Sequence, residues 1–216
     1  MSLTTIYFIR HATPDRNDRS DRSANNDATF PLSEKGLADV ALVTEFLQDK
    51  KIDTILSSPF KRSYDTVADF AMKSGLTIEV IEDFRERAIS ETWLDDFYAF
   101  GRRQWDDFSY KLPGGENLSE VKIRNIAALE DVLMRHKGKN IAIGTHGTAL
   151  SMIIHHYDPS YSYEEWKAMP MPWVAKLTFD ETGCVGIEKI DLFTIALEAG
   201  RSRCELLAHA TRGVTV

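Results

Sequence analysis

The sequence predicts an α/β fold, a three-layer α/β/α sandwich with a mostly parallel central sheet. Short apolar runs rich in β-branched residues occur at residues 4–9, 54–57 and 141–144, and each has the length of a buried parallel strand. Amphipathic segments of helical length separate these runs. Two of the runs lead into a histidine, at the edge where open α/β sheets bind their ligands.

The first half of the chain alternates strands with helices. The predicted elements are a strand at 4–9, a polar loop at 15–29, a helix at 33–49, a strand at 54–57, a helix from about 59 to 73 and a short strand at 78–81. Ser33 is suited to cap the first helix, because its hydroxyl accepts a hydrogen bond from a free backbone N–H group. Pro59 lies near the start of the second helix, where proline is tolerated.

The second half combines a long amphipathic helix, a further parallel strand and a hairpin. The predicted elements are a helix at 118–137, a strand at 141–144, a helix at 148–157 and hairpin strands at 173–179 and 185–190. Gly138 is suited to end the long helix, and Glu116 is expected to cap its start. The chain after Ile195 has too little pattern to assign an element.

An aromatic-rich insertion interrupts the alternation at about residues 88–116. One interpretation is an extra helix that packs its rings on the body of the protein. Another is a lid over the strand ends, with a substrate contact from Arg102 or Arg103. The two are compatible, because a lid also packs. We therefore expect residues 1–216 to form a single domain with this helical, lid-like insertion.

Composition limits the classes of partner. The 216 residues carry a formal net charge of −7, so nucleic acid is not expected as a partner, because its binding requires many cations. Two cysteines, Cys184 and Cys204, do not make a disulfide framework, and the N-terminal residues lack the features of a signal peptide. No run is long enough to span a membrane. We expect a cytoplasmic protein with no membrane partner, and the oligomeric state stays open.

Charged and imidazole side chains gather where three predicted strands end. Arg10 and His11 end the first strand, His146 follows the strand at 141–144, and Arg62 lies in the first helical turn after another strand. Parallel strands bring these ends to one edge of the sheet. A neutral imidazole is a competent nucleophile, and arginine binds phosphate through paired N–H groups. The expected partner is a small phosphorylated metabolite.

Phosphoryl transfer also requires a proton for the leaving oxygen. The segment 82–87 follows the short strand and offers the carboxyl groups of Glu82, Asp83 and Glu86, among which the spacing does not choose. No cluster of residues resembles a set of metal ligands. Because the cationic side chains already supply positive charge, we expect a reaction without a metal or another cofactor.

Six short motifs follow one another between about residues 4 and 150. They are Arg10-His11-Ala12 with Asn17, Leu32-Ser33-Glu34-Lys35-Gly36, Ser57-Ser58-Pro59-Phe60-Lys61-Arg62-Ser63 with Thr66, Phe84-Arg85-Glu86, Pro113-Gly114-Gly115-Glu116 and Thr145-His146-Gly147. Together they resemble the motifs of the histidine phosphatase superfamily, the phosphoglycerate-mutase-like proteins, and of its phosphatase branch. Ala12, Pro14 and Asn117 depart from the residues most usual in that family.

The resemblance implies a phosphoglycerate-mutase-like sandwich and a role for each matching residue. His11 would take the phosphoryl group, Glu86 would protonate the leaving group, and water would then hydrolyse the phosphohistidine. The phosphate-binding residues that it implies are Arg10, Asn17, Arg62 and His146.

Three functions are compatible with these motifs. The first is a metal-independent phosphomonoesterase. The second is a phosphoglycerate-type phosphomutase, but mutases of the family carry a tyrosine-glycine element after the acid, where this chain has Ala88-Ile89-Ser90. The third is a non-catalytic phospholigand-binding protein, which the intact set of histidines, arginines and acid disfavours. The phosphatase is therefore preferred.

Overall fold

A six-stranded sheet forms the centre of the computed structural model, which describes residues 2–15, 28–91, 94 and 96–200. The strands are β1 (Thr4–Arg10), β2 (Thr54–Ser57), β3 (Ile78–Val80), β4 (Asn140–Thr145), β5 (Trp173–Asp180) and β6 (Gly183–Ile190), in the order β3-β2-β4-β1-β5-β6. The pairs β3–β2, β2–β4 and β4–β1 are parallel, whereas β5 is antiparallel to both β1 and β6. The mostly parallel sheet and the hairpin at its edge are confirmed.

The helices predicted between the strands are present, with ends that differ by one or two residues. They are α1 (Glu34–Gln48), α2 (Lys61–Ser74), α4 (Leu118–Arg135) and α5 (Gly147–Tyr157). The inserted segment contains α3 (Phe97–Asp106), and a 3₁₀ turn at Glu82–Phe84 follows β3. Sequence analysis missed α6 (Tyr163–Ala168) and α7 (Leu192–Glu198), which are too short to show a helical period. No helix within the described residues is long and apolar enough to cross a membrane.

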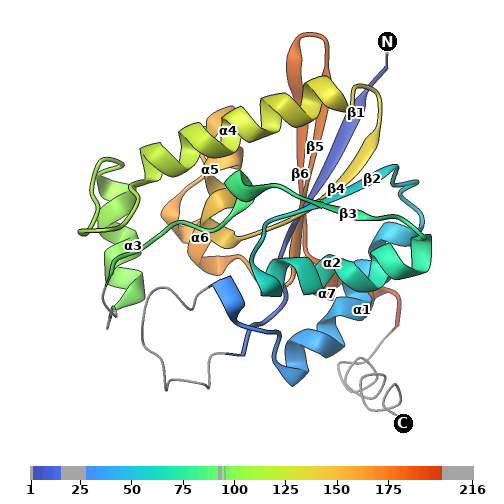
Figure 1. Cartoon of the computed structure of the whole chain (residues 1–216), viewed down its shortest axis with the longest axis horizontal. Helices are drawn as coiled ribbons and strands as arrows, with labels where there is room; N and C mark the ends of the chain where they lie inside the picture. The colour runs from blue at the N-terminus through green and yellow to red at the C-terminus, as the bar shows by residue number, and fades with distance from the viewer. Residues whose placement is uncertain (1, 16–27, 92–93, 95, 201–216) are drawn as a thin grey trace.

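Two apolar layers enclose the sheet, because successive residues of a strand point to opposite faces. In β1, Ile6 and Phe8 pack with residues of α4, α5 and α6, whereas Tyr7 and Ile9 pack with residues of α1, α2 and α7. Figure 1 shows α4 and α5 on one side of the sheet and α1 and α2 on the other. The expected three-layer α/β/α sandwich is confirmed.

The start of α1 is tied to the chain that leaves β1. The Ser33 hydroxyl accepts a hydrogen bond from the Gly36 N–H (3.1 Å) and donates one to the Thr13 carbonyl (3.0 Å). Gly36 is needed at this point, because a Cβ atom there would lie 2.1 Å from the Thr13 oxygen. The predicted cap at Ser33 is therefore confirmed, and it fixes the backbone just beyond His11.

The start of α4 differs from the prediction. Asn117 is the N-cap residue, and its side chain and that of Glu120 form a reciprocal capping box. The expectation that Glu116 caps this helix is wrong, because its carboxylate instead binds the guanidinium groups of Arg85 and Arg124. Asparagine is as good an N-cap as serine, so its departure from the family pattern preserves the helix start.

The buried face of α4 generates a test of the core. Leu129 has no exposed surface and packs in the apolar layer that α4, α5 and α6 form on the sheet, whereas Met134 on the same helix is 76% exposed. Leu129→Ala should lower the free energy of unfolding by about 2–5 kcal/mol through lost burial and a residual cavity. Met134→Ala, the matched control, should change it by less than about 0.5 kcal/mol. Urea denaturation measures both, and similar effects of the two substitutions would contradict the packing described.

Candidate active site

The register of β1 and β4 brings the two histidines together. Arg10 at the end of β1 pairs with Thr145 at the end of β4, and the His11 N–H donates to the Thr145 carbonyl at 3.0 Å. His11 and His146 are thus the first residues beyond two adjacent parallel strands. Their ring centroids lie 5.2 Å apart, and both residues are buried.

Arg62 reaches the same point from the first turn of α2. Its side chain is buried, and its Nε donates a hydrogen bond to Nε2 of His11 at 3.1 Å. A guanidinium group can only donate, so Nε2 of His11 accepts and carries a lone pair. The proton of the neutral ring is then on Nδ1, which donates to the Ala12 carbonyl at 2.7 Å. Two contacts therefore set the tautomer of His11.

Small residues allow α2 to lie against the strand ends. The Ala12 N–H donates to Oγ1 of Thr66 at 2.9 Å, and the same hydroxyl donates to the Arg62 carbonyl at 2.7 Å. Gly144 in β4 faces α2, where a Cβ atom would lie 3.0 Å from the Ser63 carbonyl oxygen. The serine-proline…arginine motif thus places Arg62 by close backbone packing.

His146 is fully buried beside this cluster. Its Nε2 lies 2.7 Å from the Ser58 hydroxyl, and its ring meets that of Phe60 edge to face at a centroid distance of 5.1 Å. Burial lowers the pKa of His146 well below its usual value, and the positive charge of Arg62 lowers it further. The ring is therefore neutral near pH 7 when no anion is bound.

Arg10 lies at the N-terminal end of α5. Its guanidinium donates to the Met169 carbonyl, and it lies close enough to Gly147 that a Cβ atom there would be 3.2 Å from it. Gly147 directly follows His146, so two arginines and two histidines, from the end of β1, from α2 and from the junction of β4 and α5, share one edge of the sheet. This concentration of positive charge favours an anionic ligand.

Glu86 is the carboxyl group of its segment that reaches this edge. One oxygen accepts from the Thr148 N–H at 3.0 Å and the other from the Arg87 N–H at 2.8 Å. Thr148 is in the first turn of α5, two residues after His146, and a helix N-terminus favours a carboxylate. Glu82 and Asp83 are exposed on the preceding 3₁₀ turn.

Arg87 is a fully buried cation next to Glu86. Its Nη1 donates to the side chain of Gln104 on α3. Three aromatic rings lie 5.2–5.5 Å from the guanidinium carbon, those of Phe97, Phe100 and Trp166. Burial lowers the pKa of Arg87 to about 10, against the effect of the Glu86 carboxylate, so the group remains charged at neutral pH. The inserted helix thus packs directly on the residue that follows the candidate acid.

Other arginines of the insertion are engaged elsewhere. Arg102 pairs with Glu164 and lies 3.9 Å from the ring centroid of Tyr163, which anchors α3 to α6. Arg103 lies 4.2 Å from the ring centroid of Tyr110. Neither contact directs these arginines to the histidines. Asn17 lies outside the described residues.

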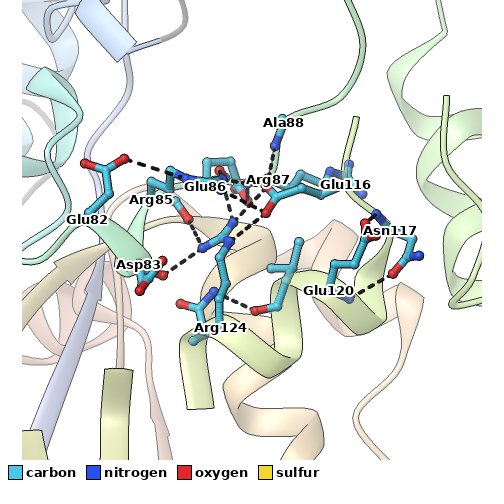
Figure 2. Close-up of polar contacts among 12 residues, drawn as sticks. Glu82, Asp83, Arg85, Glu86, Arg87, Ala88, Glu116, Asn117, Glu120 and Arg124 are labelled. Atoms are coloured by element: carbon cyan, nitrogen blue, oxygen red, sulfur yellow. Dashed lines mark hydrogen bonds and ion pairs between the residues drawn. The ribbon is translucent and has the colours of Figure 1, made fainter. Parts of the chain in front are cut away.

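Sequence reasoning missed several residues that support the site. It assigned no role to Ser58 or Thr66, although both belong to a motif that it singled out. It also missed Arg124, which donates to backbone carbonyls of residues 82–90, here called the acid segment (Figure 2). The sequence signal that could have found Arg124 is an arginine on the apolar stripe of a helix, three residues after Val121.

Over the described residues, no group of three or more His, Cys, Asp or Glu residues could hold a metal ion.

The chain belongs to the histidine phosphatase superfamily (branch 1), whose sequence profile it matches over residues 6–185. It is 28% identical to phosphoserine phosphatase 1 of Hydrogenobacter thermophilus, over 67% of this chain and 71% of that protein. It is 27% identical to phosphoglycerate mutase-like protein 4 of Arabidopsis thaliana, over 72% of this chain and 71% of that protein. Its fold is similar to that of YhfR from Bacillus stearothermophilus, with a TM-score of 0.72, 22% identity, and coverage of 88% and 98% of the two chains.

The buried state of His146 leads to a prediction about ligand binding. In the free protein, its ring should stay neutral at pH 7, and binding of inorganic phosphate should raise its pKa, because the anion offsets the charge of Arg62. NMR titration of the imidazole nitrogens, with and without phosphate, measures both states. His136 on the far end of α4 is the internal control and should not respond. Phosphate that binds without moving the His146 titration would contradict this account.

Proposed function

We propose that this protein is a metal-independent phosphomonoesterase that acts through a phosphohistidine on His11. The observation that carries the proposal is the hydrogen bond from Nε of Arg62 to Nε2 of His11. It sets the Nε2 lone pair of a neutral imidazole against a buried positive charge. That lone pair becomes available for attack when a bound phosphate takes over the Arg62 N–H group. A phosphate drawn to that charge therefore lies beside the atom that must attack it.

The phosphate is held by Arg10, Arg62 and His146. The two arginines offer planar sets of N–H donors that suit the oxygens of a phosphoryl group. His146 is neutral when no anion is bound, so one of its ring nitrogens carries a proton to donate. These groups stabilise the charge spread over the three equatorial oxygens in the transition state, which is the role that a metal serves in other phosphoryl-transfer enzymes.

The reaction takes two steps. In the first, the lone pair on Nε2 of His11 forms a bond to phosphorus and the bond from phosphorus to the leaving oxygen breaks. Glu86, which is protonated at the start of this step, gives that oxygen its proton. In the second, Glu86 takes a proton from water as the water oxygen attacks phosphorus, and the bond between phosphorus and Nε2 of His11 breaks. Inorganic phosphate is released, and His11 returns to its neutral starting state. Both steps require Glu86 near the bond to phosphorus that breaks or forms.

The substrate is a small phosphorylated metabolite. The names of the relatives direct the first screen to phosphoserine and phosphoglycerates, followed by sugar phosphates, nucleotides and phosphopeptides. One relative is named as phosphoglycerate mutase-like, so the phosphomutase activity is tested as the alternative. Release of inorganic phosphate distinguishes a phosphatase from a mutase. A mutase would interconvert phosphoglycerates while releasing little phosphate.

Replacement of the nucleophile tests the first step. His11→Ala should abolish turnover of an aryl phosphate, because the substitution removes the nitrogen that forms the bond to phosphorus. Acid-labile, base-stable labelling of the protein by the substrate should disappear with it. The assay is run in excess chelator, in which the wild-type enzyme should stay fully active.

Two outcomes would overturn this mechanism. One is a label that persists in His11→Ala, and the other is wild-type activity that chelation removes and magnesium or zinc restores. Circular dichroism and the urea midpoint of His11→Ala verify that the variant is folded.

Replacement of the acid tests its dependence on the leaving group. Glu86→Gln should lower kcat by about 10²-fold or more for alkyl phosphates, whose alkoxide needs a proton. The loss should be much smaller for aryl phosphates, because a phenolate leaves with less help. Glu82→Gln is the matched control, since its carboxyl group is exposed on the same segment. Equal losses on both substrate types would assign Glu86 to phosphate positioning instead.

A further inference from the structure

The candidate acid stands on a segment with no regular secondary structure. After the 3₁₀ turn at Glu82–Phe84, residues 85–90 run between β3 and α3 without helix or strand. A general acid must nevertheless stay within hydrogen-bond reach of the leaving oxygen, and a displacement of about 1 Å can lower the rate by about 10²-fold. Something outside the segment must therefore hold it.

Arg124 of α4 binds the backbone of this segment at three carbonyl groups. Its Nη1 donates to the carbonyls of Asp83 (2.7 Å) and Arg85 (3.0 Å), and its Nη2 approaches that of Glu86 (3.3 Å). The side chain is only 12% exposed. Figure 2 shows the guanidinium of Arg124 between the acid segment and the start of α4.

Glu116 holds Arg124 in this position and binds the segment itself. Its two carboxylate oxygens accept from Nε and Nη2 of Arg124 at 2.8 and 3.0 Å. They also accept two N–H groups of Arg85, at 2.6 and 3.0 Å, and the N–H of Ala88 at 2.9 Å. The backbone N–H of Glu116 donates to the Ala88 carbonyl at 2.8 Å. The segment is thus fixed on both sides of Glu86.

Charge keeps this arrangement intact. Burial alone would raise the pKa of Glu116, but hydrogen bonds from Arg124 and Arg85 lower it to about 2. The carboxylate therefore stays ionised throughout the neutral and mildly acidic range. Gly115 also has to be glycine, because a Cβ atom there would lie 2.1 Å from the Ile89 carbonyl oxygen. The turn before α4 and the acid segment are packed backbone to backbone.

We propose that Arg124 and Glu116 are positioning residues for catalysis, which hold Glu86 at the N-terminus of α5 by fixing the backbone around it. The proposal rests on the proposed function, in which Glu86 is the general acid. The hydrogen bonds of Arg124 and Glu116 join them to each other and to the chain around Glu86. The positive charge of Arg124 also lowers the pKa of His146. Arg124→Lys keeps that charge, so the proposal assigns the loss that remains in this variant to the placement of the Glu86 carboxyl group.

The test uses Arg124→Met with Arg135→Met as its matched control. Both arginines are on α4, but Arg135 pairs with Glu79 and Asp131 at the surface. Arg124→Met should lower kcat for alkyl phosphates by about 10- to 100-fold, with a much smaller loss for aryl phosphates and little change in KM. Arg135→Met should leave both rates unchanged. Arg124→Lys, which keeps the charge without the planar fork, should recover only part of the loss.

A double variant separates positioning from a general structural role. Arg124→Met combined with Glu86→Gln should be no slower on alkyl phosphates than Glu86→Gln alone, because the acid that Arg124 positions is already absent. Hydrogen exchange at the Ala88 amide should rise in Arg124→Met and in Glu116→Gln, while the amides in the middle of α4 stay protected. Glu116→Gln also keeps the test available if Arg124→Met fails to fold.

The outcomes distinguish this proposal from the one on which it rests. If Glu86→Gln shows the leaving-group effect and Arg124→Met and Glu116→Gln lack it, the positioning role is wrong and the mechanism stands. If Arg124→Met slows both substrate types equally, or adds its full loss to that of Glu86→Gln, the positioning role is also wrong. If Glu86→Gln itself lacks the effect, the acid assignment falls and the positioning role falls with it.

Discussion

The hydrogen bond between Arg62 and His11 is the interaction on which the site depends, because it settles three properties at once. It orients the imidazole, it makes Nε2 the ring nitrogen that carries the lone pair, and it brings a permanent positive charge to the atom that we propose as the nucleophile. Close packing of α2 on β4 through Gly144 makes it possible, as does the parallel register of β1 and β4 that sets His11 beside His146. The packing of the layers therefore places Nε of Arg62 at 3.1 Å from Nε2 of His11.

Electrostatic balance separates the two halves of the site. The half that we propose to bind phosphate is buried and carries positive charge, and both features lower the pKa of His146. The acid half is closer to neutral, because Glu116 lies against two arginines and Glu86 lies at a helix N-terminus. In the proposed function, a substrate whose phosphate binds in the first half places its leaving oxygen near the second.

Much of this arrangement can be predicted from the sequence, and the remaining features could not be predicted for physical reasons. Strand ends, helix periods and ordered motifs predict the sandwich and bring His11, Arg62 and His146 to one edge. The tautomer of His11 is encoded only in part by local sequence, because the Ala12 carbonyl belongs to the next residue but the Arg62 donor comes from α2. The role of Glu116 was missed since a carboxylate before a helix usually reads as a cap, and only the three-dimensional structure shows its two arginine partners. The cytoplasmic location stays a prediction.

The enclosure of Arg87 by aromatic rings affects how easily α3 separates from the body of the protein. Such separation normally exposes apolar surface to water, with a free-energy cost proportional to the area exposed. Here separation would also return the Arg87 guanidinium to water, and this recovers part of the desolvation free energy of several kcal/mol that burial of an ion costs. It would also break cation–π contacts worth about 2 kcal/mol or less each. The cost of opening α3 locally is therefore set by the balance of these opposing free energies and not by its apolar contacts alone.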